Sequence, residues 1–136
     1  MSAEGRFVLD TSALLRFYLS DGILLDDLER TLESASRGEV LILVPDLLFL
    51  EVASVLYKQV RLELMTADEA KELLQEIGRL PLRSVSAAEL KCDALVAALA
   101  EGLTVYDAAY LVLARREGAK LLTVDTKLQK VAQLCL

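Results

Sequence analysis

Short apolar runs of strand length alternate along this chain with longer segments of helical spacing. The strand-like runs cover residues 7–9, 40–44, 82–85 and 120–124. Helical spacing covers residues 13–19, 24–36 and 46–62, a segment from Thr66, residues 86–101 and 104–117, and a short segment from Thr126. Strands that alternate with such helices are typical of parallel sheets with right-handed crossovers. The pattern predicts an α/β/α sandwich whose central parallel sheet has four or five strands, the fifth being a possible edge strand near the C-terminus.

Capping residues indicate where several of these helices begin and end. The tetrapeptides that start at Thr66 and at Ser86 both have the capping-box pattern. Asp46 follows a strand-ending proline and can cap the helix after it. Gly102 and Gly118 are helix stop signals.

The length and composition of the chain indicate one domain that spans residues 1–136. The chain has no repeat and no linker-like segment, and 54% of its 136 residues are apolar. Such a chain can bury a sizeable core and leave an apolar face for a partner. We expect a homodimer, with the helices from Leu24 and from Thr66 as the source of that face. No apolar run approaches 18 residues and the start lacks signal-peptide features, so we expect a cytoplasmic protein without a membrane partner.

The absence of histidine narrows the chemistry that the chain can perform. The two cysteines, Cys92 and Cys135, lie far apart and outside any CxxC pattern. The cysteine spacing and the lack of histidine together exclude the common zinc sites. The lack of histidine also removes the usual general base that activates serine and cysteine nucleophiles. Hydrolytic chemistry would therefore run on carboxylates with a hard cation such as Mg²⁺ or Mn²⁺.

Four carboxylates stand where the ligand site of a parallel sheet is expected. Asp10 and Asp125 directly follow strand-like runs, and Asp107 lies in the first turn of a helix. Glu51 lies inside an otherwise apolar helical segment, where a carboxylate is costly unless it is paired or binds a metal. In such sheets, ligands bind at the carboxyl ends of the strands.

Each of these positions also has a purely structural interpretation. Asp10 and Asp125 are suitably placed to cap helices, and Asp107 forms a T-x-x-D capping arrangement with Thr104 in a first helical turn that suits an acid. Glu51 can belong to a solvated stripe with Ser54 and Lys58.

Hydroxyl groups beside the carboxylates can support them. Thr11 and Ser12 can orient Asp10 or water at a metal, and Thr123 can hold Asp125. Tyr106 and Tyr110 are expected to pack rather than react.

The ordered set of four motifs closely resembles the PIN-domain family, and within it the VapC-type toxins of toxin–antitoxin pairs. The motifs are D-T-S after the first strand, a glutamate inside an apolar helix, Y-D-A-x-Y, and T-x-D-x-x-L after a late strand. The resemblance runs from Phe7 to the C-terminus. It implies a metal-dependent ribonuclease whose catalytic and metal-binding residues are Asp10, Glu51, Asp107 and Asp125. It also implies dimerisation and inhibition by a cognate antitoxin protein.

The chemistry expected from this resemblance is hydrolysis of an RNA phosphodiester by water activated by one or two Mg²⁺ or Mn²⁺ ions. The products would carry 5′-phosphate and 3′-hydroxyl ends, since a cyclic-phosphate route normally uses histidines. The net charge of −6 opposes bulk RNA binding, so phosphate contacts would rest on a local basic patch. The candidate contacts are Arg16, Lys58, Arg61, Lys127 and Lys130.

Other functions fit the sequence less well. A haloacid-dehalogenase-type phosphatase needs a D-x-D pair, and Asp10-Thr11-Ser12 lacks the second acid. A receiver-type signalling domain also needs paired acids at the first strand end, and the larger 5′ nucleases need insertions for which this chain has no room. The non-enzymatic alternative is a PIN-fold RNA-binding or scaffold module without cleavage activity.

Overall fold

The computed structural model describes residues 5–19 and 28–134. Its sheet consists of four strands, β1 (Arg6–Leu9), β2 (Leu41–Pro45), β3 (Arg83–Val85) and β4 (Lys120–Leu122). The strand order is β3-β2-β1-β4 and every pairing is parallel. The predicted α/β fold with a parallel sheet is therefore confirmed.

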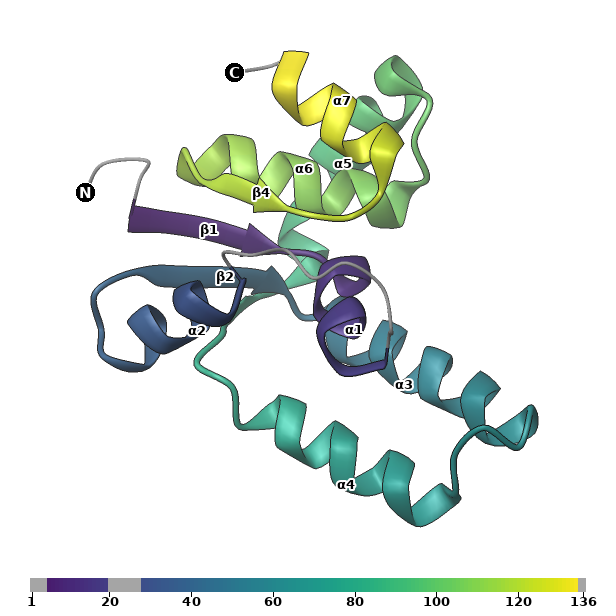
Figure 1. The fold of residues 1–136 in the computed structure, drawn as a ribbon. Helices are drawn as coiled ribbons and strands as arrows, with labels where there is room; N and C mark the ends of the chain where they lie inside the picture. Colours follow the sequence, from purple (N-terminus) through teal and green to yellow (C-terminus); the bar gives the residue numbers. More distant parts are fainter. Residues whose placement is uncertain (1–4, 20–27, 135–136) are drawn as a thin grey trace.

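Helices make up most of the remaining described chain (Figure 1). They are α1 (Thr11–Leu19), α2 (Leu28–Ser36), α3 (Leu47–Arg61), α4 (Ala67–Gly78), α5 (Ala87–Glu101), α6 (Val105–Glu117) and α7 (Thr126–Leu134). Helix α2 packs on β2 in front of the sheet in Figure 1, and α6 packs on β1, β2 and β4 behind it. Helices α3 and α4 pack on each other and extend away from the sheet. The possible C-terminal edge strand is not formed within the described residues, which end in α7.

The register of the sheet places two strand ends side by side. Leu9, the last residue of β1, pairs with Leu122, the last residue of β4. The chain then continues in the same register, because the amide of Asp10 donates to the carbonyl of Leu122 at 3.1 Å. Asp10 and Thr123 therefore emerge together at the carboxyl edge of the sheet, with the buried side chains of β1 and β4 directly behind them.

Two of the predicted helix caps differ from the structure. Thr66 forms the expected capping box with Glu69. Ser86, however, makes no side-chain cap hydrogen bond, and neither does Asp46 with its own helix. Oδ1 of Asp46 instead accepts from the amide of Ala87 at 2.9 Å, so it satisfies the start of α5. The pairing of β2 with β3 explains why Asp46 bonds to α5, because it brings together the residues that follow the two strands.

The exposed apolar side chains lie on other helices than we expected. One group lies on α5 and at the start of α6, and we call it the α5–α6 apolar patch: Leu95, Val96, Leu99, Val105 and Tyr106. A second group lies on α3 and just after it: Leu50, Tyr57, Leu62 and Leu64. The described residues of α2 and α4 contribute no exposed large apolar side chain, because their apolar positions pack inward. The described residues of α2 and α4 therefore do not supply the exposed apolar face that we expected of the helices from Leu24 and Thr66, and the homodimer itself stays a prediction. Residues 24–27 lie outside the described ones.

Within residues 5–19 and 28–134, no single helix is long and apolar enough to cross a membrane. Helices α5 and α6 reach the required length only as a pair, and they are bent by 108° relative to each other.

Candidate active site

Asp10 is the buried centre of the candidate site. Its side chain is 4% exposed, and both carboxylate oxygens accept hydrogen bonds. Oδ1 accepts from the hydroxyl of Ser12 at 2.7 Å and from the amide of Ala13 at 3.0 Å, so Asp10 also caps α1. Oδ2 accepts from the hydroxyl of Thr123 at 2.6 Å. The capping and functional interpretations of Asp10 are thus compatible.

Thr123, directly after β4, bonds to the carboxylate of Asp10 and to the backbone of Asp125. Besides donating to Asp10, its hydroxyl oxygen accepts from the amide of Asp125 at 3.0 Å. It also lies 3.2 Å from the hydroxyl of Ser12, whose oxygen accepts from the amide of Val124. The side chain of Thr123 is 3% exposed, so these bonds hold the loop after β4 against the start of α1 in a dry environment.

Glu51 reaches the site from α3, and two hydroxyls hold it. Its Oε1 accepts from the hydroxyl of Tyr110 at 2.6 Å and from the hydroxyl of Thr11 at 2.9 Å. Thr11 therefore contacts Glu51, whereas we expected it to orient Asp10. Glu51 is half-buried, while Ser54 and Lys58 on the same stripe of α3 are exposed. Glu51 thus points into a polar cluster and is not part of the solvated face.

Asp107 and Asp125 occupy the more open side of the site. Asp107 is half-buried in the first turn of α6, where its amide donates to the hydroxyl of Thr104 at 3.0 Å. Asp125 is exposed, and its Oδ1 caps α7 by accepting from the amide of Leu128 at 2.9 Å. Both expected caps are therefore present in the structure.

The carboxylates affect one another electrostatically. Burial raises the pKa of Asp10 above its usual value, and the charge of Asp107 adds to that rise, while the bonds from Thr123, Ser12 and Ala13 oppose it. Burial also raises the pKa of Asp107, with repulsion from Asp125 as the next cause and the nearby charge of Lys127 opposing it. The charge of Asp107 thus acts on Asp10, and the charge of Asp125 acts on Asp107, so these three acids form a negative region that Lys127 compensates only in part.

This region suits a hard divalent cation by its chemistry. Its donors are carboxylate and hydroxyl oxygens, which Mg²⁺ and Mn²⁺ prefer. A cation would favour the charged forms of Asp10 and Asp107, whose pKa values are raised mainly by burial and additionally by repulsion from a neighbouring acid. With the side chains as they stand, no group of three or more Asp, Glu or Cys residues in the described ranges could hold a metal ion together. The fit therefore rests on the donor chemistry and on the two repelling pairs, Asp10 with Asp107 and Asp107 with Asp125.

One of the five basic candidates is placed beside the carboxylates. The ammonium group of Lys127 donates to the carbonyl of Gly102, the residue after α5, and its charge acts on Asp107. Lys58 and Arg61 follow Glu51 along α3 by two to three turns, about 10–15 Å at the helical rise. Arg16 is half-buried on α1 and Lys130 is exposed on α7. The structure thus brings Lys127 to Asp107 and leaves Lys58 and Arg61 farther along α3.

Tyr110 is the site residue that the sequence pattern did not reveal. We expected it to pack, and its side chain is indeed only 2% exposed. Its hydroxyl nevertheless lies between Glu51 and Thr11, 2.8 Å from the Thr11 hydroxyl. Burial and the bond to Glu51 raise its pKa far above the usual value, so the phenol keeps its proton. The signal available in the sequence was the second tyrosine of Y-D-A-x-Y, one helical turn after Asp107.

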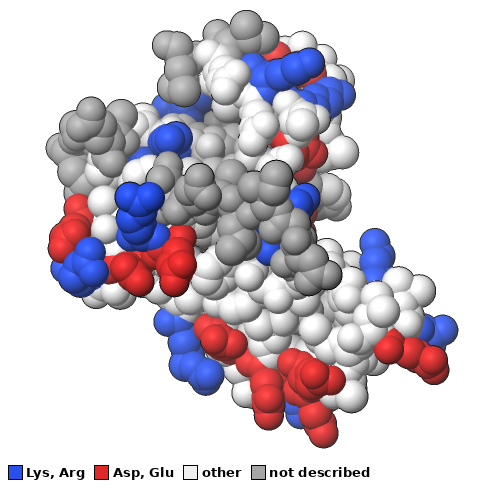
Figure 2. All heavy atoms as spheres, in the orientation of Figure 1, with Lys and Arg blue, Asp and Glu red and all other residues white. Residues whose placement is uncertain are grey.

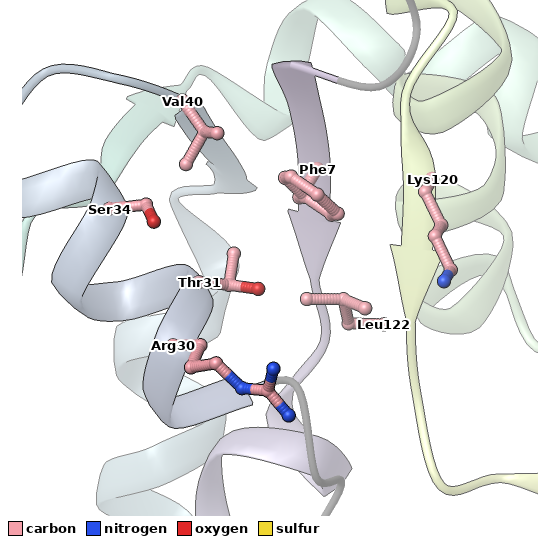
Figure 3. Close-up of a pocket in the computed structure, with 7 residues that line it drawn as sticks. All are labelled: Phe7, Arg30, Thr31, Ser34, Val40, Lys120 and Leu122. Carbon is pink, nitrogen blue, oxygen red and sulfur yellow. The ribbon is translucent and has the colours of Figure 1, made fainter.

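A separate pocket of about 400 Å³ opens on the α2 side of the sheet (Figure 3). Its lining residues come from β1, β4, α2 and the turn before β2: Phe7, Arg30, Thr31, Ser34, Val40, Lys120 and Leu122. None of the four carboxylates lines it, so the candidate site is not this cavity.

Comparison with known proteins shows the family and the fold of this chain. A sequence model of the family described as "PIN domain" matches residues 7–134. The chain is 38% identical over 125 residues to "Ribonuclease VapC3" of Pyrobaculum aerophilum, covering 90% of this chain and 92% of that protein. The crystal structure of PAE2754 from the same organism superimposes with a TM-score of 0.70 at 22% identity, over 93% of this chain and 79% of that one, and so shares the fold. Because the family model matches nearly the whole length of this chain, the chain belongs to the PIN domain family, as its four acidic motifs predicted.

Proposed function

We propose that this protein is a metal-dependent endoribonuclease of the VapC type, with Asp10, Glu51, Asp107 and Asp125 as its catalytic and metal-binding residues. The observation that carries the proposal is the placement of Asp10 at the carboxyl edge of the sheet, where Ser12 and Thr123 bond to its two oxygens, in a chain that belongs to the PIN domain family. A sequence relative whose name is "Ribonuclease VapC3" supports the choice of RNA as substrate.

One or two Mg²⁺ or Mn²⁺ ions, held by these carboxylates, would supply charge stabilisation at the phosphoryl group and lower the pKa of a water molecule. The protein's own contribution is to keep the ligands in place. Ser12 and Thr123 fix both oxygens of Asp10, and Thr11 fixes Glu51. The chain contains no histidine that could serve as acid and base on a cyclic-phosphate route, so we expect products with 5′-phosphate and 3′-hydroxyl ends.

RNA would meet the site through a local group of basic side chains. On the face shown in Figure 2, acidic residues gather over α4, whereas acidic and basic residues lie together over α2 and near α7. Lys127 and Lys130 belong to α7, and Lys127 is already beside Asp107. We propose these two as the principal phosphate contacts, with Arg16, Lys58 and Arg61 as outer contacts for a longer strand.

We further propose that the protein is cytoplasmic, forms a homodimer and is inhibited by a cognate antitoxin. The α5–α6 apolar patch is the dimer surface that the described residues favour, because it groups five exposed apolar side chains on two consecutive helices. A basic side chain of the antitoxin would pair with the acids of the site.

Cleavage of a labelled RNA pool tests the proposal. We expect cuts with Mg²⁺ or Mn²⁺ and none with EDTA, and Asp107→Asn should abolish them without loss of folding. Asp68→Asn, on the exposed first turn of α4, is the matched control and should cut like the wild type. A wild-type protein that leaves the pool intact with either ion would instead be an RNA-binding or scaffold module.

Metal binding is measured separately from cleavage. A cation that binds only the folded state raises the melting temperature by mass action. We expect millimolar Mg²⁺ to stabilise the wild type and to stabilise Asp107→Asn less. Equal melting curves with Mg²⁺ and with EDTA would contradict a shared metal site.

A further inference from the structure

Three oxygen atoms from three helices meet at Glu51. They are Oε1 of Glu51 on α3, the hydroxyl of Thr11 on α1 and the hydroxyl of Tyr110 on α6. All three separations are short, at 2.6, 2.8 and 2.9 Å. Two hydroxyl protons serve these three contacts, so in every arrangement at least one proton points at Oε1 of Glu51.

The two hydroxyls have different freedom to move. Tyr110 is 2% exposed and belongs to the main core cluster, and its neighbours Ala109 and Leu111 are buried as well. Its rigid ring therefore holds the hydroxyl at one place. Glu51 has three rotatable side-chain bonds, and fixing such a side chain costs rotamer entropy. The immobile hydroxyl of Tyr110 thus restricts the conformation of the flexible Glu51 side chain.

The hydrogen bonds leave one side of the Glu51 carboxylate available. Among the described residues, both hydroxyls bond to Oε1, and no hydrogen bond to Oε2 is formed. A carboxylate anchored through one oxygen presents its other oxygen in a restricted direction. The packing of α3, α1 and α6 therefore sets where Glu51 can act.

We infer that Tyr110 is a positioning residue for Glu51: its hydroxyl, together with that of Thr11, anchors Oε1 and so directs Oε2 at the catalytic site. This inference rests on the proposed function, in which Glu51 is a catalytic carboxylate. Tyr110 itself touches neither substrate nor cation in this role. Its contribution passes entirely through Glu51.

Tyr110→Phe removes the hydroxyl and keeps the buried ring. We expect kcat for RNA cleavage to fall by about tenfold or more, since a hydrogen bond to a charged group is lost, while KM changes little. Affinity for Mn²⁺, measured by calorimetry without RNA, should also weaken. Thr11→Val should act in the same direction, and Thr11→Ser, which keeps the hydroxyl, should restore activity. Tyr18→Phe removes the same atom from α1 outside the site and is the matched control, expected to behave as the wild type.

A double-mutant cycle separates positioning from a general structural effect. In a Glu51→Gln background, Tyr110→Phe should change kcat and Mn²⁺ affinity by less than about twofold. The same loss in both backgrounds would show that Tyr110 acts on the fold and not through Glu51, and unchanged kcat and Mn²⁺ affinity in Tyr110→Phe would equally overturn the inference. If the wild type cuts no RNA, the proposed ribonuclease function fails, and the Mn²⁺ titrations of the same variants still decide whether Tyr110 positions Glu51.

Discussion

The hydroxyl of Thr123 lies 2.6 Å from Oδ2 of Asp10, joining two residues that are 113 positions apart in the sequence. The two residues follow neighbouring parallel strands, whose last residues, Leu9 and Leu122, are paired in the sheet. The bond is buried, and Asp10 has both of its oxygens occupied by protein donors. The carboxylate at the centre of the site is therefore held before any ligand arrives, which is the arrangement expected of a preorganised site.

Thr123→Val tests the importance of that bond. The change keeps the shape of the side chain but removes a donor from a buried carboxylate, so we expect a loss of about 1–3 kcal/mol in the free energy of unfolding. Urea denaturation gives this value. Thr126→Val, on the exposed first turn of α7, is the control and should stay within about 0.5 kcal/mol of the wild type. A Thr123→Val protein as stable as the control would show that water replaces the bond at no cost.

The stability of the metal-free protein should depend on pH through Asp10. Burial raises the pKa of Asp10 in the folded state, so the folded protein binds this proton more tightly than the unfolded chain does. The resulting stability is fully present below the usual pKa, near 3.8, and is lost as the pH rises through the raised value. Asp10→Asn removes this titration, so its unfolding free energy, measured in EDTA, should fall less steeply above pH 4 than that of the wild type. Parallel pH profiles for the two proteins would contradict this account.

Dimerisation should depend on the α5–α6 apolar patch. Leu99 is 78% exposed at its centre, and a charge there would have to be desolvated in a buried interface. We expect light scattering at tens of micromolar to give a dimer for the wild type and a monomer for Leu99→Glu. Gln75→Glu adds the same charge to an exposed position of α4 and should remain dimeric. A monomeric wild type would remove the proposed dimer, and a dimeric Leu99→Glu would move the interface to another surface.

Inhibition by the proposed antitoxin should compete with Mg²⁺, because the antitoxin and the cation would bind to the same acids. It should also weaken with added salt, because salt screens the attraction between opposite charges. Asp107→Asn should loosen the complex more than Asp10→Asn, since Asp107 is half-buried whereas both oxygens of Asp10 are already bonded. Asp68→Asn should have no effect. An antitoxin that bound the Asp10→Asn/Asp107→Asn variant as tightly as the wild type would have to be held by the apolar surface instead.

Features that depend on neighbouring residues could be read from the sequence. The alternation of apolar runs predicted the four strands and their helices, because side-chain periodicity is a local consequence of backbone geometry. The capping box at Thr66 and the caps by Asp10, Thr104 and Asp125 join residues three positions apart and formed as expected. The positions of three of the four acids, at strand ends and in a first helical turn, follow from the same local patterns.

The tertiary structure decided the contacts between distant segments. Asp46 caps α5, 41 residues away, because β2 pairs with β3. Tyr110 bonds to Glu51, 59 residues away, because the fold brings these two side chains of α6 and α3 together. Composition indicated an excess of apolar residues, but only packing determined that α5 leaves Leu99 exposed while α4 turns its leucines inward. Periodicity defines which face of a helix is apolar. Whether that face is buried depends on which other element packs against it, and this packing is determined by contacts throughout the tertiary structure.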